Sequence, residues 1–493
     1  MKDTLQRELQ QIPTFSNLTP DSTMTQFLAG AAQRDLMPTP DQIDNTLHST
    51  MKLSFDPLGS PLRAKAVALS HGDTNGILIV LDFVLLPREH SDPLRQTIAT
   101  ELDLQMDDIV ISSTHSHSTP RAEPMGGPQP VYELVCRQTT EVAAAAWEAR
   151  QPARLGHDRT FAVGASFNQR KPLPKGGGDW PACARVKFAR DFREALATGR
   201  PIDPRVSVLR IDDASGQPIA GWVRFSAHPA CVIFDTPISA EYPGYMTDQM
   251  SEEFANGAPM LFGYGASGDV NCLPMFGTEE DTRNLGLQLA ALAGPVFAGI
   301  ETKELQRFTS RTGTIELPLD PPPPIEQLDS EIAEVEAYIQ AVENDPTLAW
   351  VLDVNFKPEW RTELKQGAAR PLAEWARRLK AALESGRTFP DAWPISATAW
   401  TLDDLAIIFN SGEPFTELSL ELAARSPLAE TLLISMTNGT EGYIGTDEDK
   451  RRGGYEMNTS NRYSMLEHGC RPLPFAFGAG DRLIEGCLEL LTT

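Results

Sequence analysis

The sequence is poor in cysteine and lacks any long apolar run. Its six cysteines are spread over 493 residues without a CxxC pair, which argues against a disulfide framework or a thiolate zinc site and indicates reduced thiols. No stretch approaches the roughly 18 to 20 apolar residues of a membrane-spanning helix. The N-terminus, MKDTLQRELQQIPTFSNLTP, is polar and has no apolar signal core. These absences predict a cytoplasmic protein without a stable membrane anchor.

Basic side chains are also scarce. The 43 lysines and arginines are outnumbered by 67 acidic residues, so the formal net charge is -24. Nucleic acids and anionic membranes would repel such a chain at long range, which argues against a nucleic-acid partner. The hydrophobic content of 41% is sufficient for a large buried core. The sequence therefore predicts a globular protein, and it leaves open whether the chain forms a homo-oligomer.

Apolar runs typical of strands alternate with amphipathic helical segments. AKAVALSHG and GILIVLDFVLLP read as two strands across a turn, DPLRQTIATELDL reads as a helix, and DDIVISSTHSH reads as a strand. This order predicts an α/β fold with a layered mixed β-sheet core flanked by helices. We expect a short helical extension over residues 1–25 and one catalytic domain over residues 26–493. We also expect a charged helical insertion at about 325–385. It would form a lid over the site, a dimer interface or a solvated helical hairpin.

Two apolar strands end on histidine, although the chain has only eight histidines. His115 and His117 lie in ISSTHSHSTP, where a continuing strand would point both side chains to one face. His228 ends a second strand in VRFSAHPA, and Glu413 follows a third in DLAIIFNSGEP. Imidazoles with an oxygen ligand suit a metal site. The alternatives are hydrogen-bonded histidines at strand ends and a glutamate in the first turn of a helix.

Two further segments carry polar groups in glycine-containing turns. GYGASGDV matches GxGxxG, but Pro274 follows closely and opposes the helix that a dinucleotide site needs. Its glycines are therefore expected to let the backbone approach a ligand, with Asp269 and Asn271 exposed on the turn. Tyr443 and Tyr455 flank a hydrophilic loop, either as functional groups or as aromatic anchors of that loop.

Taken together and in order, six motifs resemble the neutral/alkaline non-lysosomal ceramidase family. They are ISSTHSHSTP, FNQR, FSAHPA, YGASGDVN, GEPFTE and GYIGT…GGYE, and the resemblance runs from about residue 27 to residue 469. It implies the family's zinc-dependent catalytic domain, with one Zn²⁺ per chain. The zinc ligands that it implies are His115, His228, Glu413 and Tyr443. The residues that it implies at the scissile group are His117, Arg170 and Tyr455.

This resemblance implies hydrolysis of an amide bond by a zinc-activated water. Zinc lowers the pKa of a bound water to about 7, and donors such as Arg170, His117 or Tyr455 would stabilise the charge that develops on the carbonyl oxygen. A protonated His117 or Tyr455 would also protonate the leaving amine. The expected substrate is a small-molecule or amphiphilic N-acyl compound. Ester or lactone hydrolysis at the same zinc, or a non-catalytic zinc-containing binding protein, are the alternatives.

The chain also departs from the family's pattern. Asn271 stands where the family carries a serine that contacts substrate, and Glu241 stands where it usually carries an aspartate. Asp269, Asn271 and Glu241 are accordingly the expected substrate-binding residues. The C-terminal immunoglobulin-like domain of the full-length ceramidases is missing from this sequence. These departures predict a divergent member that retains the metal ligands but to which the family's substrate, ceramide, does not carry over.

Overall fold

The computed structural model describes most of the chain. The described residues are 26–42, 53–55, 58–120, 130–170, 199–232, 236–275, 277–356, 360–463 and 471–492. The helical extension expected at residues 1–25 lies outside them. Within them, no helix is both long enough and apolar enough to cross a membrane.

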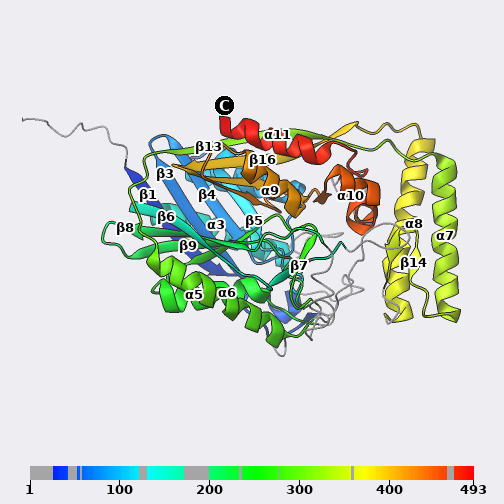
Figure 1. The fold of residues 1–493 in the computed structure, drawn as a ribbon, viewed down its shortest axis with the longest axis horizontal. Helices are drawn as coiled ribbons and strands as arrows, with labels where there is room; N and C mark the ends of the chain where they lie inside the picture. The colour runs from blue at the N-terminus through cyan, green and yellow to red at the C-terminus, as the bar shows by residue number, and fades with distance from the viewer. Residues whose placement is uncertain are drawn as a thin grey trace, which may run out of the picture.

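An eight-stranded mixed sheet forms the centre of the molecule (Figure 1). Its order is β11-β9-β8-β6-β1-β3-β4-β5, and only the end pairs β11/β9 and β4/β5 are parallel. The strands are β1 (Phe27–Asp35), β3 (Arg63–His71), β4 (Thr74–Leu81), β5 (Ile109–Ser113), β6 (Gln151–Phe161), β8 (Arg205–Asp213), β9 (Pro218–Phe225) and β11 (Met260–Tyr264). The expected hairpin is confirmed, since β3 and β4 pair antiparallel across a tight turn at residues 72–73.

A four-stranded sheet stacks on the first. It has the order β13-β16-β17-β19, formed by β13 (Phe308–Pro318), β16 (Ala392–Leu402), β17 (Leu405–Asn410) and β19 (Glu430–Ile434). Apolar side chains of both sheets form one buried cluster between them, including Leu69, Trp222, Trp400 and Ile407. Because the strands alternate their side chains between two faces, each sheet also has an outer apolar face that needs cover.

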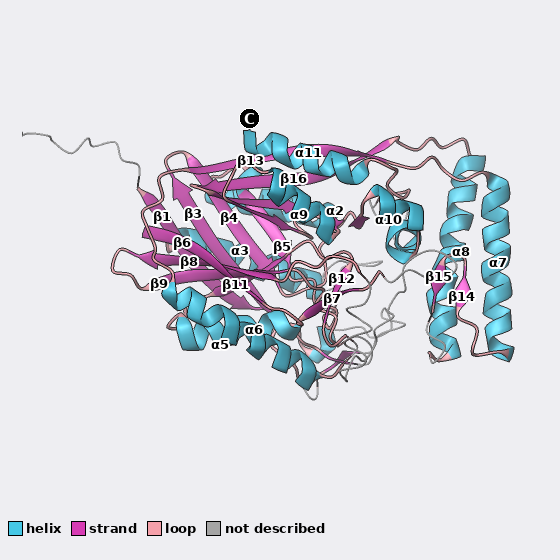
Figure 2. Ribbon diagram, in the orientation of Figure 1, coloured by secondary structure: helices cyan, strands magenta, loops and turns pink. Residues whose placement is uncertain are grey.

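Helices cover those outer faces (Figure 2). The larger sheet is covered by α2 (Arg88–Leu102), α3 (Pro130–Glu148), α5 (Glu241–Phe254) and α6 (Glu279–Gly299), and the smaller sheet by α9 (Thr416–Arg425) and α11 (Ala479–Thr492). In α3, the buried residues Val131, Val135, Val142 and Ala146 recur at helical spacing and pack against the sheet. The expected α/β fold, a layered mixed sheet flanked by helices, is confirmed.

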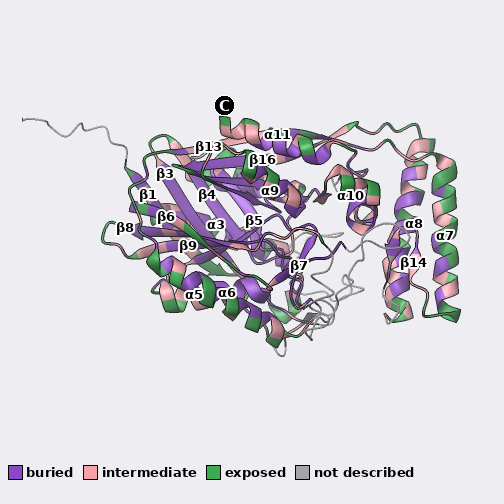
Figure 3. Ribbon diagram, viewed as in Figure 1, coloured by how far each residue is buried: buried purple, intermediate pink, exposed green. Residues whose placement is uncertain are grey.

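The charged insertion forms a helical hairpin beside the layered body (Figure 1). It consists of α7 (Ile325–Asn344) and α8 (Thr362–Glu384), with the short strands β14 (Trp350–Val351) and β15 (Val354–Asn355) between them. Its helices have a small core of their own, which includes Val335, Tyr338 and Leu372. Figure 3 shows exposed residues along the outer side of the hairpin and buried residues along the sheets.

Short elements lie in the connections between the longer strands and helices. They are η1 (Pro40–Gln42), β2 (Leu53–Ser54), η2 (Met106–Asp108), β7 (Ser166–Asn168), β10 (Thr236–Pro237), β12 (Val270–Cys272), β18 (Glu413–Pro414), β20 (Tyr443–Ile444), α10 (Asp447–Arg452), η3 (Tyr455–Thr459) and η4 (Ser460–Tyr463). Single bridges join Ser112 to Thr437 and Gly265 to Ile434 at one end of the stacked sheets. The ends of β5, β11 and β19 therefore meet there, as strand ends in α/β folds commonly do.

Candidate metal centre

His115 is positioned by a turn of the chain. The strand β5 ends at Ser113, and His115 has a left-handed backbone with φ of +65°. The expectation that the strand continues through both histidines is therefore wrong, because this backbone ends the alternation of the strand. The His115 amide donates to the Phe83 carbonyl (3.0 Å), and its Nδ1 lies 2.6 Å from the Val84 carbonyl oxygen. These contacts direct Nε2 away from the strand.

Three imidazoles nevertheless meet. His228 follows β9, and its Nδ1 lies 3.0 Å from the carbonyl oxygen of Val270. One ring nitrogen from each of His115, His117 and His228 lies within 4.8 Å of the other two. Because main-chain carbonyls hold the Nδ1 atoms of His115 and His228, the Nε2 atom of each ring is available to a ligand.

Glu413 lies between these two histidines. Its Oε1 is 2.7 Å from His228 Nε2 and 3.3 Å from His115 Nε2, and it accepts a hydrogen bond from the Tyr264 hydroxyl (3.0 Å). Burial by itself would raise the pKa of Glu413, but the two imidazoles outweigh burial and lower it. A carboxylate and two oriented imidazoles thus converge on one point, as the motifs predicted.

His117 differs from the other two histidines. Burial, and then the neighbouring rings of His115 and His228, lower its pKa well below the ordinary value, so the resting imidazole is neutral at pH 7. Its Nε2 is buried and has no hydrogen-bond partner among the described residues. Its ring meets that of His115 edge-on, with 4.9 Å between centroids. His117 thus reaches the same place, but within the described part of the chain no main-chain carbonyl holds its ring as one holds each of the other two.

Both expected tyrosines lie at this site. Tyr443 pairs with Glu413 in the parallel bridge of β18 and β20, and its ring centroid is 6.3 Å from that of His228. Burial raises the pKa of the Tyr443 phenol well above its usual range. Tyr455 begins η3, a short π-helical turn, with its ring 6.1 Å from Tyr443. The loop between the tyrosines therefore belongs to the site.

Arg170 is almost fully engaged by the segment that carries Tyr455. Its Nη1 donates to Glu456 (2.5 Å), its Nε donates to Asp449 (3.2 Å), and its Nη2 donates to the Gly453 carbonyl (2.8 Å). Glu456 also accepts from Gln169 (2.8 Å), and Asp449 also accepts from Arg200 (2.6 Å). These charges are buried and paired, as burial requires.

The glycine-rich turn serves packing. The expectation that Asp269 and Asn271 are exposed is wrong, because both are buried. The Asp269 carboxylate accepts from Asn168 Nδ2 (2.6 Å) and the Thr416 amide (2.8 Å), and burial raises its pKa to about 6. A Cβ on Gly268 would lie 2.5 Å from the Glu413 carbonyl oxygen. Gly268 thus allows the Glu413 strand to approach the turn closely. The sequence had suggested that a ligand would approach the turn at this place.

Asn271 and Glu241 both support histidine loops. Asn271 pairs with His228 in a parallel bridge, and its Nδ2 donates to Gln169. Glu241 is completely buried at the start of α5, where its carboxylate accepts from the amides of His117 (3.1 Å) and Cys231 (2.8 Å).

Three residues of the site were missed from the sequence. Tyr264 bonds Glu413 and stacks on His115 at 4.8 Å, while Asp449 and Glu456 hold Arg170. Tyr264 ends the apolar strand MLFGY, so the same rule that selected the histidines would have found it. The two acids lie among many others in a charged loop and carry no such signal.

Comparison with solved structures identifies the fold. The neutral ceramidase from Pseudomonas aeruginosa matches with a TM-score of 0.63 and 13% sequence identity, over 95% of this chain and 74% of that chain. A ceramidase complexed with C2 matches with a TM-score of 0.64 and 12% identity, over 95% of this chain and 75% of that one. No family model matches the sequence, and no curated protein matches it significantly. The resemblance seen in six short motifs is thereby confirmed for the whole architecture: this chain has the fold of the neutral ceramidases.

Proposed function

We propose that the protein is a zinc-dependent hydrolase of amide bonds, with His115, His228, Glu413 and Tyr443 as the ligands of one Zn²⁺. The observation that carries the proposal is the convergence of two imidazole Nε2 atoms on one carboxylate oxygen, at 3.3 and 2.7 Å. Each of these histidines is oriented through Nδ1 by a main-chain carbonyl, the usual support of a metal-bound histidine. The fold of the neutral ceramidases agrees with this reading.

The residues present fit zinc. Nitrogen from neutral imidazoles and oxygen from a carboxylate are its preferred ligands, and a phenol oxygen adds a fourth hard donor. Cys231 and Cys272 follow His228 and Asn271 in the sequence and are buried, but no cysteine of the described residues joins the cluster of candidate ligands. When bound, zinc supplies a water molecule of lowered pKa, near 7, and polarises a carbonyl oxygen.

His117 and Tyr455 are the proposed substrate contacts. A neutral His117 with an unpartnered Nε2 is suited to take a proton from the attacking water and to pass it to the leaving amine. Once it has taken that proton, His117 is in the protonated form that the resemblance implies for the donor to the leaving amine. The hydroxyl of Tyr455 would then be the donor to the carbonyl oxygen, whose developing charge such donors stabilise by about 3 kcal/mol each.

Arg170 has a different part in this proposal. Three of its nitrogen atoms donate to the segment of Asp449, Gly453 and Glu456, which ends beside Tyr455. Arg170 would therefore position Tyr455, and one Nη1 hydrogen, which has no partner among the described residues, would be left for the substrate.

The proposed substrate is an N-acyl compound, small or amphiphilic, hydrolysed in the cytoplasm. The neighbours are ceramidases, and cleavage of an acyl bond needs the same attacking water and oxyanion donors whether nitrogen or oxygen leaves. The measurement that separates amide from ester activity is a matched panel of chromogenic amides, esters and lactones.

Turnover of that panel tests the proposal. We expect amide hydrolysis that a strong chelator abolishes, that zinc restores, and that is lost in His228→Ala. His157→Ala is the matched control, since His157 lies on β6 and contacts Asp404 at 3.4 Å, away from the cluster. Turnover that survives in the chelated enzyme or in His228→Ala would refute it. Bound zinc without turnover of any substrate would indicate a binding protein, and preference for esters would indicate an esterase.

A further inference from the structure

Glu241 occupies an unusual place for a carboxylate. It is the first residue of α5 and is 0% exposed. Its backbone is left-handed, with φ of +52°, which costs a non-glycine residue about 1 kcal/mol or more. Such strain persists only where the surroundings hold it, and it clusters at functional sites.

The two oxygens of this carboxylate serve two different loops. Oε1 accepts from the amide of His117 (3.1 Å) and from the hydroxyls of Ser118 (3.2 Å) and Ser116 (3.4 Å). Oε2 accepts from the amides of Cys231 (2.8 Å) and Val232 (3.2 Å). One carboxylate therefore joins the loop of His115 and His117 to the loop that follows His228.

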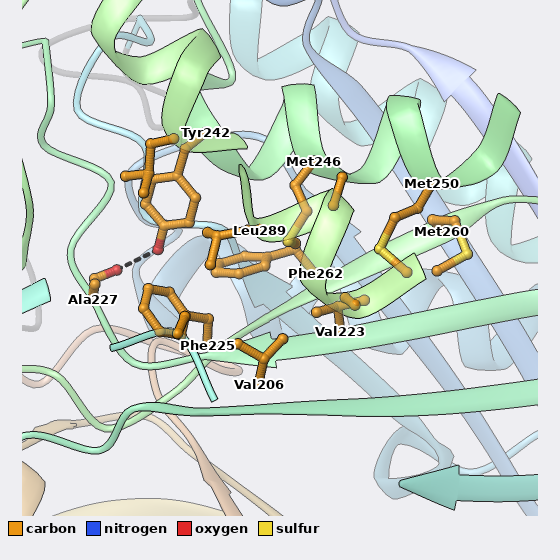
Figure 4. Packing of buried hydrophobic residues seen from close by; sticks show 14 of the residues in the cluster. Val206, Val223, Phe225, Ala227, Tyr242, Met246, Met250, Met260, Phe262 and Leu289 are labelled. Carbon is orange, nitrogen blue, oxygen red and sulfur yellow. Dashed lines mark hydrogen bonds between the residues drawn. The ribbon is translucent and has the colours of Figure 1, made fainter. Parts of the chain in front are cut away.

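Neighbouring contacts fix the backbone at Glu241. The Glu241 amide donates to Ser239 Oγ (3.0 Å). Next to it, the Tyr242 hydroxyl donates to the carbonyl of Ala227 (2.6 Å), the residue before His228 (Figure 4). Figure 4 also shows Tyr242 and Met246 of α5 packed on Phe225 and Phe262 of the sheet, and Met250 beside Val223 and Met260. The start of α5 is thus anchored in the core, and it presents Glu241 to both loops from a rigid helix.

We infer that Glu241 is a positioning residue that sets the metal affinity of the site, because it fixes the spacing between the imidazoles of the two loops. This inference rests on the proposed zinc site but does not depend on the substrate. Replacing outer partners of metal ligands typically weakens metal binding by 10- to 100-fold. Glu241 itself touches neither the ligand nitrogens nor, in this role, the substrate.

Two substitutions separate the reach of the side chain from the number of its acceptor oxygens. Glu241→Gln keeps the shape but replaces one acceptor oxygen with an NH₂ group, so only one of the two loops can still be bound. Glu241→Asp keeps both acceptors on a shorter side chain. The control is Glu430→Gln, which changes another buried carboxylate at the far end of β19, where its partners are Arg159 and Arg205.

The measurement is the zinc dissociation constant, from competition with a chromogenic chelator, beside the denaturation midpoint of each zinc-free protein. We expect about 10- to 100-fold weaker binding for Glu241→Gln, intermediate binding for Glu241→Asp, and wild-type binding for Glu430→Gln. If Glu241→Gln shows no cooperative unfolding and is therefore not folded, the inference is tested with Glu241→Asp alone. This variant must then bind zinc more weakly than the wild type.

Wild-type affinity in the folded Glu241 variants, with stability alone reduced, would overturn the inference. This result would differ from the result that refutes the proposed function. A wild-type protein that binds zinc but hydrolyses nothing refutes the hydrolase and leaves the Glu241 comparison valid.

Discussion

Replacing Arg170 by alanine is expected to destabilise the fold as well as lower activity. The substitution leaves two buried carboxylates behind. Glu456 loses a 2.5 Å contact and keeps only Gln169 (2.8 Å) among the described residues, whereas Asp449 keeps Arg200 (2.6 Å) and Thr446 (2.7 Å). Loss of one partner from a buried ion pair costs about 3 to 5 kcal/mol. Since Asp449 stays compensated, we expect a loss near the lower end, about 3 kcal/mol.

Chemical denaturation measures this cost directly. The free energy of unfolding is compared for wild type, Arg170→Ala, Glu456→Gln and the double variant. The double variant should be less destabilised than the sum of the single variants, because each single change removes the same contact. Arg425→Ala is the control: its partners Glu421 and Glu485 lie on the surface, so its effect should stay within about 0.5 kcal/mol.

The result bears on what Arg170 does. A positioning residue should couple stability and activity, since displacing the Glu456 segment also displaces Tyr455. The reasoning is refuted if the free energy of unfolding of Arg170→Ala lies within about 1 kcal/mol of the wild-type value and if the effects of Arg170→Ala and Glu456→Gln on it are additive. Arg170 would then act only through the substrate.

Three further changes have defined outcomes. Tyr264→Phe removes the hydroxyl that orients Glu413 (3.0 Å), so the zinc dissociation constant should rise about 10-fold or more; an unchanged constant would contradict this. Trp375→Ala should lower the free energy of unfolding by about 3 to 5 kcal/mol, because Trp375 is buried under the guanidinium of Arg462, 4.9 Å from its ring; denaturant titration checks it. Burial raises the pKa of Asp82 to about 6, above its ordinary 3.8. The native state therefore holds this proton more tightly than the unfolded state does. Its contribution to the free energy of unfolding, at most about 3 kcal/mol, is lost as the pH rises from about 4 to 6. Asp82→Asn should remove that fall from the pH profile of stability, and an identical profile would refute the assignment.

Local patterns were sufficient for the layers of the fold. The hairpin of β3 and β4, the helix α3 and the hairpin of α7 and α8 each lie where periodicity placed them, because each buries a face defined by neighbouring residues. The rule that strand ends carry sites also selected His115, His228 and Glu413, and in the structure the Nε2 atoms of both histidines lie within 3.3 Å of Glu413 Oε1.

Long-range contacts account for what the sequence could not predict. Arg170 meets Asp449 and Glu456 across more than 270 residues of chain, and no local pattern encodes such a pairing. The left-handed backbone of His115 likewise depends on tertiary contacts with Phe83 and Val84. Strand alternation was therefore the wrong reason for bringing His115 and His117 together.

The helical hairpin shows the same limit. Its charge pattern left a lid, an interface and a solvated hairpin equally open. In the structure Arg462 of η4 pairs with Glu331 of α7 (2.7 Å) and covers Trp375 of α8, and Thr459 of η3 donates to Asp353. The inner side of the hairpin therefore supports the segment that begins with Tyr455, which relates the insertion to the site.

The metal content of the purified protein tests the central claim most directly. Elemental analysis after exhaustive dialysis against zinc-free buffer should give one zinc per wild-type chain and one per His157→Ala chain, but none per His228→Ala chain. A wild-type protein without stoichiometric metal, or a His228→Ala protein that retains it, would contradict a zinc centre at His115, His228 and Glu413.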